Sequence, residues 1–332
     1  MSAAEIFNTM VNTYDEIREL WYAWLFSRLH FIVAKEIIKK YDPKTVLDVG
    51  CGTGFQSFLH ASAGASVVGI DITEGLIKVA NKKSITFEPK KKINLFPSYY
   101  DFVEKYNQLI GVLLSKVIAG NQYKQPSFQI ADARYLPFVN ESYDHINCCG
   151  STLCFIEDHQ LAISEIARVL KPGGTVLLEG DSRWNLDLFW SVLDAILKSR
   201  WGYDKPFFKA IRAIFAPLTD YIINRYPLDQ PEDQRCNIKA FTAKGLKLEL
   251  AKYHLKVVKN WTIHSVTNFI PSTYLDKSDP PKWLKILFKS FANIEERIPV
   301  ALPGLSMVCL AFKEKKLRSE NNLIIRRENN DE

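Results

Sequence analysis

Several features that would place this chain in a familiar functional class are absent from its sequence. No stretch approaches the roughly 18 uninterrupted apolar residues of a transmembrane helix, so we expect no membrane-spanning segment. The six cysteines include one adjacent pair and no CxxC spacing, which argues against a disulfide framework or a zinc site. The N-terminal segment has neither the basic start nor the apolar core of a secretion signal. We therefore expect a cytoplasmic protein with reduced thiols and no bound metal.

A strong excess of charge of either sign is also missing. The 332-residue chain has a formal net charge of +6 and is 47% hydrophobic, which is typical of a folded protein with one large domain. The mild positive balance would suit RNA or an acidic membrane surface, but solvated faces and tails give the same value. Composition therefore leaves a nucleic-acid partner open without favouring it, and it says nothing about oligomeric state.

Hydrophobic periodicity indicates the fold class. Apolar runs alternate with amphipathic segments over residues 45–181, as in repeated βαβ units around a parallel sheet. Strands are predicted at residues 46–49, 66–71, 127–132, 143–149 and 175–181, and a later strand follows a helix within 241–266, with a last strand at 305–315. The sequence thus predicts an α/β, Rossmann-like sheet of seven mostly parallel strands, with helices on both faces and a terminal antiparallel strand.

Two insertions are longer than such a sheet requires within a single domain spanning residues 1–315. Residues 82–126 carry eight lysines against three acids, and residues 184–240 begin with an aromatic stretch that we interpret as helical. Long insertions in compact domains are usually lids or binding elements. The aromatic insertion could line a pocket for a lipophilic acceptor, dock on a membrane face or form a core of its own, and the basic insertion could contact phosphates or be a solvated loop. Residues 316–332 are predicted to be a disordered tail.

A glycine-rich turn follows the first predicted strand, in "VLDVGCGTG" (46–54). A dinucleotide site needs G-x-G-x-x-G, but Phe55 or Ser57 stands where the third glycine belongs, and no P-loop lysine follows. Asp48, directly before the glycines, would repel a pyrophosphate but suits a cofactor that carries an ammonium and a sulfonium. This combination favours S-adenosylmethionine.

Two further acids come at the ends of predicted strands. Asp71 closes the second strand about 20 residues after the glycines, where a carboxylate can accept hydrogen bonds from a ribose diol. Asp132 ends the third strand, where its side chain and the following backbone can meet an adenine amino group. Together with Asp48, these acids mark the carboxyl ends of three strands, the edge at which open α/β sheets bind ligands.

In these motifs the chain resembles the class I S-adenosylmethionine-dependent methyltransferases, in the broad group that includes the ubiquinone- and menaquinone-biosynthesis-type enzymes. The resemblance rests on "VLDVGCGTG" (46–54), "VVGIDIT" (67–73), "ADARYLPFVNESYDHI" (131–146) and "EIARVLKPGGTVLL" (165–178). A weaker match is "FTAKGLKLELAKYHLKVV" (241–258), and "FNTMVNTYDEI" (7–17) is similar to the segment that closes over the cofactor in this group. The resemblance therefore implies a helical N-terminal lid over residues 1–44 and a cofactor-binding core over residues 45–181.

The resemblance also implies which residues surround the cofactor: Tyr14, Asp48, Gly50, Cys51, Gly52, Gly54, Asp71, Ile72, Asp132, Ala133, Cys149 and Gly150. Asp48 and the glycine turn would hold the methionine end, and Asp71 the ribose. Ile72 would pack on adenine, whose amino group Asp132 and Ala133 would read. The segment "CCGSTLCF" (148–155) and both insertions depart from the family pattern where the acceptor would bind, so the resemblance leaves the acceptor open.

Methyl transfer by in-line displacement asks the protein mainly to align the reactants and exclude water. A base is needed only if the acceptor starts as a neutral hydroxyl, an acidic carbon or a protonated amine. We therefore assign no catalytic residue and keep Tyr14, His264 and Glu179 as candidates.

Three functional hypotheses follow, and they differ in the acceptor. The favoured one is methyl transfer to a small or lipid-like hydrophobic acceptor enclosed by the insertions, with peripheral membrane contact as a further option. The second is an RNA or protein methyltransferase that docks through the basic insertion. The third is a catalytically silent member that binds S-adenosylmethionine or its product S-adenosylhomocysteine without turnover.

Overall fold

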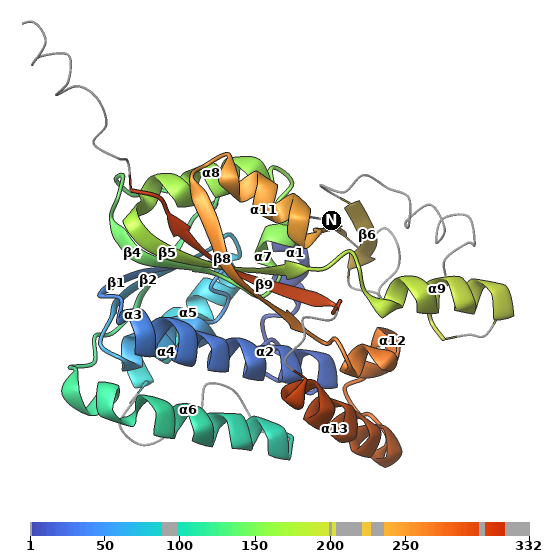
Figure 1. Cartoon of the computed structure of the whole chain (residues 1–332). Helices are drawn as coiled ribbons and strands as arrows, with labels where there is room; N and C mark the ends of the chain where they lie inside the picture. The colour runs from blue at the N-terminus through green and yellow to red at the C-terminus, as the bar shows by residue number, and fades with distance from the viewer. Residues whose placement is uncertain are drawn as a thin grey trace, which may run out of the picture.

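A seven-stranded sheet forms the centre of the molecule, in the order β3-β2-β1-β4-β5-β9-β8 (Figure 1). The computed structural model describes residues 2–87, 99–198, 201–203, 221–226, 236–298 and 303–315. The strands are β1 (Thr45–Val49), β2 (Ser66–Asp71), β3 (Ser127–Ile130), β4 (Tyr143–Cys148), β5 (Leu170–Asp181), β8 (Leu255–Ile263) and β9 (Ser306–Lys313). β9 runs antiparallel to both β5 and β8, and the other pairs are parallel. The predicted fold class is confirmed, with the last strand inserted beside the edge strand β8.

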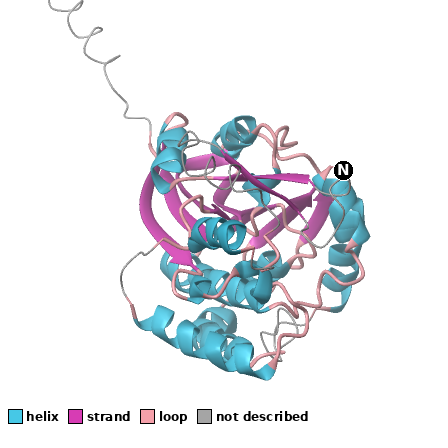
Figure 2. Ribbon diagram, turned by 90° about the vertical axis from the view of Figure 1, so that its right-hand side faces the viewer, coloured by secondary structure: helices cyan, strands magenta, loops and turns pink. Residues whose placement is uncertain are grey.

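Helices cover both faces of this sheet (Figure 2). One layer comprises α2 (Leu20–Ile32), α4 (Phe55–Ser62), α5 (Glu74–Thr86) and α6 (Asp101–Gly120), and the other α7 (Thr152–Phe155), α8 (His159–Val169) and α11 (Ala243–Ala251). The central strands are apolar almost throughout, with Leu47 and Val176 fully buried, because a sheet covered on both faces offers its strands no solvent side.

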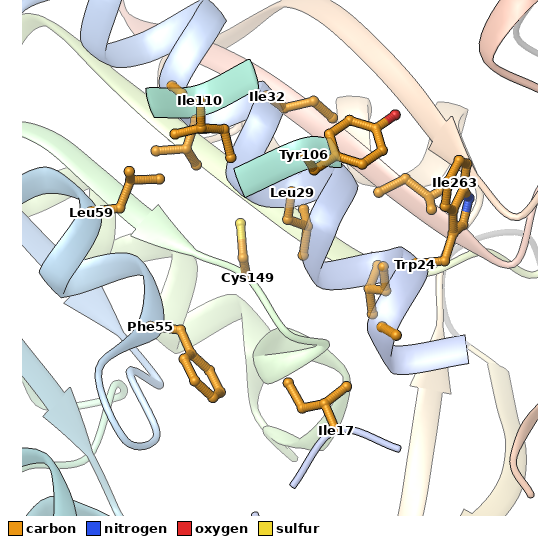
Figure 3. Packing of buried hydrophobic residues seen from close by; sticks show 14 of the residues in the cluster. Ile17, Trp24, Leu29, Ile32, Phe55, Leu59, Tyr106, Ile110, Cys149 and Ile263 are labelled. Atoms are coloured by element: carbon orange, nitrogen blue, oxygen red, sulfur yellow. The ribbon is translucent and has the colours of Figure 1, made fainter. Parts of the chain in front are cut away.

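The N-terminal segment is largely helical. It comprises α1 (Ala3–Thr9), α2, a π-helical turn at Val33–Ile38 and α3 (Lys39–Tyr41). α2 is apolar on nearly all sides because it lies between the sheet and α6, and Tyr106 and Ile110 of α6 point toward Leu29 and Ile32 of α2 (Figure 3). Much of the basic insertion is thus the helix α6, whereas residues 88–98, with the lysine run 90–92, lie outside the described residues.

The helical interpretation of residues 184–226 is correct at one end and wrong at the other. α9 (Leu186–Leu197) is a helix, but β6 (Tyr221–Tyr226) is a strand that pairs antiparallel with β7 (Cys236–Ala240) in a second, two-stranded sheet. The run "YIINRY" consists largely of β-branched and aromatic residues, which favour a strand once a partner strand is available. The rest of this insertion and the predicted tail at 316–332 lie outside the described residues.

The connection from β8 to β9 holds further short helices. They are η3 (Thr267–Phe269), α12 (Ser272–Leu275) and the longer α13 (Lys282–Arg297). Since β8 runs parallel to β5, this connection begins at the carboxyl edge of the sheet, the same edge as the glycine turn.

Candidate active site

The glycine turn after β1 has a backbone that only glycine tolerates well. Gly50 and Gly52 have φ values of +68° and +53°. A Cβ at Gly50 would lie 2.2 Å from Thr152 Oγ1, and one at Gly52 would lie 2.9 Å from the Tyr14 hydroxyl. The turn therefore packs closely against α7 on one side and against the N-terminal segment on the other.

A small cavity lies beside this turn. Its lining residues are Tyr14, Phe26, Asp48, Gly50, Cys51, Phe55, Gln56, Cys149 and Gly150. The structure thus brings together six of the residues predicted from the sequence, which come from the N-terminal segment, from β1 and its turn, and from the end of β4. Phe26 of α2 and the α4 residues Phe55 and Gln56 complete the wall; Figure 3 shows Phe55 and Cys149 in this region.

Asp48 is buried and held in a fixed orientation. Its carboxylate accepts hydrogen bonds from Ser57 Oγ at 2.6 Å and from Asn147 Nδ2 at 2.9 Å. Burial raises the pKa of Asp48 to about 6, although both hydrogen bonds act against this rise. A cation in the cavity would favour the ionised carboxylate.

Gln56 is a cavity residue that the sequence did not single out. Its side chain is only 6% exposed, and among the described residues neither amide atom has a hydrogen-bond partner. Leaving a buried polar group unsatisfied costs about 1–3 kcal/mol, so the pair of unpaired atoms marks a place for a polar ligand. The sequence feature that could have indicated Gln56 is its position, in the first turn of the helix that starts at the glycine turn.

The second predicted acid, Asp71, is tied to the same turn. Its Oδ2 accepts the Gly52 N–H at 3.0 Å, and its Oδ1 accepts the Thr73 N–H at 2.8 Å. Burial raises the pKa of Asp71. Each oxygen retains a lone pair for another donor. Ile72, next to it, is half exposed and offers an apolar surface.

Asp132 lies just beyond β3, on the far side of β2 from the glycine turn, and has its own partner. Arg134 grips its carboxylate through Nε at 3.1 Å and Nη2 at 2.7 Å. This bidentate contact lowers the pKa of Asp132. Asp71, Ile72, Asp132 and Ala133 thus lie along the carboxyl edge of the sheet, outside the small cavity itself.

The N-terminal segment is fastened over the glycine turn. The Tyr14 ring stacks on Phe55 with ring centroids 6.5 Å apart, and the Thr53 hydroxyl donates to Asp15. Lys83 Nζ of α5 lies 3.1 Å from Asp15 Oδ2 and 3.2 Å from Thr53 Oγ1. Burial lowers the pKa of Lys83, against the charge of Asp15. We call Asp15, Thr53 and Lys83 the latch.

Glu179 does not line the cavity but supports a turn that does. Its Oε2 accepts the Ser151 N–H at 2.6 Å, while Asp181 accepts the Ser151 hydroxyl at 2.9 Å. Burial, followed by the nearby charge of Asp181, raises the pKa of Glu179 to about 7. Both acids hold the Gly150–Ser151 turn, in which φ is +82° at Gly150 and an unusual +57° at the non-glycine residue Ser151.

His264 belongs to a different cluster. Its Nδ1 lies 2.8 Å from Thr267 Oγ1 and its Nε2 lies 3.1 Å from the Trp21 carbonyl oxygen, with the Trp21 ring stacked on the imidazole. Burial lowers the pKa of His264 to about 4. These contacts favour a structural role for His264. Of the three catalytic candidates Tyr14, His264 and Glu179, only Tyr14 lines the cavity.

The described part of the chain also bears on other classes of site. It contains no group of three or more histidine, cysteine or acidic side chains arranged to hold a metal ion. All six cysteines are free and buried, and burial raises the thiol pKa of Cys51 and Cys149. None of the described helices combines the length and the hydropathy needed to cross a bilayer.

Comparison with known proteins identifies the family. Two family models, each described as a methyltransferase domain, match residues 41–94 and 96–178. The ubiquinone biosynthesis O-methyltransferase of Hydrogenovibrio crunogenus is 30% identical over 211 residues, which cover 60% of this chain and 70% of that protein. The demethylmenaquinone methyltransferase of Symbiobacterium thermophilum is 26% identical over 175 residues, which cover 51% of this chain and 55% of that protein. The match thus spans little more than half the length of the second relative.

A solved structure supports the fold. One chain of a Haloferax volcanii complex that contains a methyltransferase activator aligns with a TM-score of 0.51 at 13% identity, over 96% of this chain and 100% of its own length. Because the identity is low, this likeness concerns the fold alone. The family models and the 30% identical relative agree with the seven-stranded sheet and with the glycine turn that follows Asp48. The chain therefore belongs to the class I S-adenosylmethionine-dependent methyltransferases.

Proposed function

We propose that this methyltransferase acts on a small, hydrophobic, lipid-like acceptor. The observation that carries the proposal is the aromatic part of the cavity wall: Tyr14, Phe26 and Phe55 contribute aromatic side chains, while Asp48, the one carboxylic acid among the lining residues, is assigned below to the cofactor. Such a wall suits an apolar ring or chain better than a polar or charged acceptor. Relatives named for ubiquinone and demethylmenaquinone methylation support the same acceptor class.

The residues at the glycine turn fit the methionine end of S-adenosylmethionine. Gly50 and Gly52 form a cradle that a Cβ would fill, and Gln56 presents two unpaired amide atoms at the cavity. We propose that Asp48 faces the ammonium and that Gln56 hydrogen-bonds to the ammonium or the carboxylate of the methionine end. When bound, the cofactor supplies a sulfonium methyl group that the acceptor displaces in line.

The adenosine end is proposed to lie along the neighbouring strand ends. The free lone pairs of Asp71 can accept from the ribose hydroxyls, and Ile72 can pack on adenine. Asp132 is proposed to read the adenine amine with Ala133. Because Arg134 already donates hydrogen bonds to Asp132, the adenine amine would have to share that carboxylate with the guanidinium.

On the methyl side of the cavity, residues of the chain position the turn after β4 and shield the reacting groups from water. Glu179 acts as a positioning residue through the Ser151 N–H, and it keeps Cys149 and Gly150 at the cavity. Tyr14 and Phe26 exclude water, which strengthens every polar contact inside. We propose no base among these residues, so the acceptor enters as a nucleophile that needs little proton removal. The RNA or protein alternative rests on the basic insertion at residues 82–126, whose lysine run 90–92 lies outside the described residues.

Calorimetric titration with S-adenosylhomocysteine tests the cofactor site. We expect the wild-type chain to bind, and Gln56→Leu to weaken binding at least about tenfold, since one hydrogen bond to a charged group contributes roughly 1.5–3 kcal/mol. Gln108→Leu on α6, whose amide donates to Glu104 on its own helix, is the matched control and should bind normally. Equal affinity of Gln56→Leu and wild type would remove Gln56 from the site.

Labelled cofactor tests the acceptor class. The enzyme is incubated with methyl-labelled S-adenosylmethionine and separate lipid, small-molecule, RNA and protein fractions. We expect label in the lipid-extractable fraction. Label confined to RNA or protein would contradict the proposed acceptor, while binding without transfer to any fraction would favour a silent cofactor-binding protein.

A further inference from the structure

The helix α13 carries apolar side chains on two faces, one of which is exposed. Leu284 and Phe288 are buried in the core, whereas Trp283, Ile286 and Ile294 are 58%, 69% and 45% exposed. At 3.6 residues per turn, these three side chains lie within one stripe of the helix surface. Single exposed apolar residues are ordinary, but a row along three turns is not.

Lysines border this stripe on one side. Lys282, Lys285 and Lys289 follow the three- and four-residue spacing of a second row along the helix. Lys285 Nζ lies 3.6 Å from Asp279, and Lys289 Nζ lies 3.1 Å from Asp101. Both acids are at least 90% exposed, so these ion pairs are weak and their lysines can exchange partners for other anions.

The exposed stripe lies at the same edge of the sheet as the cavity. Phe269, which is 54% exposed, meets Phe291 of α13 edge to face at a centroid distance of 6.2 Å. Asn268 beside it binds α9 through the Leu186 N–H at 2.8 Å and Trp190 Nε1 at 3.0 Å. Figure 1 shows α9, α12 and α13 grouped on this side of the molecule.

The buried face of α13 connects to the cavity through α2. Phe288 meets Trp24 of α2 edge to face at a centroid distance of 6.1 Å. The same helix α2 brings Phe26 to the cavity wall. A partner surface that binds α13 would therefore lie close to the cavity.

We propose that the outer face of α13, together with Phe269, docks on an anionic lipid membrane. The apolar stripe would enter the boundary between headgroups and acyl chains, and the lysine row would face the acidic headgroups. A second copy of this chain fits less well, because an antiparallel two-fold contact of α13 through this face would bring the lysine rows of the two copies together. The proposal rests on the proposed function, since a lipid-like acceptor is met in a membrane.

Flotation of the full chain with lipid vesicles tests the proposal. The probes are phosphatidylcholine vesicles with and without phosphatidylglycerol, at low and at moderate salt. We expect binding to the anionic vesicles that weakens with salt. Trp283→Ser with Ile286→Ser should reduce binding at least about tenfold, as loss of two apolar side chains predicts. Val139→Ser, which removes an apolar side chain that is 78% exposed before β4 at the opposite edge of the sheet, should bind as wild type.

A charge series completes the test. Lys282→Gln with Lys285→Gln should weaken binding to anionic vesicles roughly thirtyfold, because each lysine at the membrane surface adds its own attraction to the acidic headgroups. Lys244→Gln with Lys247→Gln on α11 should leave binding unchanged. Equal binding of the α13 variants and wild type would overturn the proposal. So would a change in sedimentation from dimer to monomer without any change in vesicle binding, which would assign the face to a second copy.

The experiments distinguish a failure of the docking proposal from a failure of the proposed function. S-adenosylhomocysteine titration of the same α13 variants should give wild-type affinity, because none of the substituted residues lines the cavity. A wild-type chain that methylates a detergent-dissolved lipid but ignores vesicles would overturn the docking face alone. A chain that binds vesicles through α13 but transfers methyl only to RNA or protein would overturn the acceptor class alone.

Discussion

Single residues at the glycine turn determine whether the site can form at all. Gly50 combines a positive φ with the closest contact, 2.2 Å from a Cβ to Thr152 Oγ1. We expect Gly50→Ala to lower the free energy of unfolding by about 1–3 kcal/mol and to abolish detectable S-adenosylhomocysteine binding. Urea unfolding and calorimetry measure the two effects.

The matched control for Gly50 lies within α6. A Cβ at Gly111 would meet nothing within 4 Å, and its φ is negative. Gly111→Ala should therefore stabilise the chain by roughly 0.5–1 kcal/mol through helix propensity and leave cofactor binding unchanged. A Gly50→Ala protein that unfolds and binds like wild type would show that the turn can relax.

Buried histidines make the stability of this fold sensitive to acid. His60 on α4 lies against His145, and among the described residues neither of its ring nitrogens has a hydrogen-bond partner. Burial lowers the pKa of His60 from 6.5 to about 3. Below pH 6.5, His60 binds a proton in the unfolded chain but stays neutral in the folded chain. The free energy of unfolding therefore falls as the pH falls.

We expect His60→Leu to remove this loss. Between pH 7 and pH 5 the free energy of unfolding should fall by about 2 kcal/mol less in the variant than in wild type, because each pH unit below 6.5 costs about 1.4 kcal/mol per such group. Urea unfolding at both pH values provides the measurement. His254→Asn, at an exposed position, serves as control, and parallel pH profiles for His60→Leu and wild type would contradict the expectation.

At the scale of elements, the latch joins the N-terminal segment to α5. Lys83 connects Asp15 with Thr53 and lies 4.5 Å above the Phe55 ring, so one side chain links the N-terminal segment, the glycine turn and α4. We expect Lys83→Met to increase hydrogen exchange over residues 7–17 and to speed release of S-adenosylhomocysteine roughly threefold to tenfold, as loss of about 1 kcal/mol of partly buried ion pairing implies.

Lys78 provides the control on the same helix. It pairs with Glu74 one turn earlier, and its side chain is 73% exposed. Lys78→Met should leave both exchange and release unchanged. If both lysine variants changed release equally, the effect would come from the charge of α5 and not from the latch.

At the scale of the whole molecule, one buried carboxylate connects three parts of the chain. Glu295 of α13 accepts hydrogen bonds from Trp24 Nε1 of α2 at 3.0 Å and from the backbone N–H groups of His264 at 3.0 Å and Val266 at 2.9 Å. Burial tends to raise the pKa of Glu295, but His264 and these donors lower it overall. Its contribution to stability is therefore full above pH 4.5 and is lost as the pH falls through its lowered pKa.

We expect Glu295→Ala to lower the free energy of unfolding by about 3–5 kcal/mol, because several buried donors lose their acceptor together. Thermal and urea unfolding at neutral pH measure this loss. Glu296→Ala, which removes the neighbouring contacts to Lys105 and Tyr106, should cost less than about 1.5 kcal/mol because that pair is more exposed. Similar losses in both variants would mean that Glu295 is no more than an ordinary helix residue.

The sequence by itself determined the features that depend on neighbouring positions. Strand periodicity, the acid before the glycines and the acids at strand ends are local patterns, and they were enough to predict the sheet and the methyl donor. Residues such as Asp48, Gly50 and Asp71 lie where their strand or turn ends, so any fold with these strands would bring them to one edge.

The tertiary structure alone decided what surrounds those positions. Gln56 and Glu295 are polar helix residues, and only the packing of other elements against them makes them buried. Residues 221–226 form a strand because β7, ten residues further along the chain, offers a partner strand. The helix α13 keeps an apolar stripe outside because its other face already fills the core. Burial and pairing depend on contacts between distant segments, and a local sequence pattern does not contain that information.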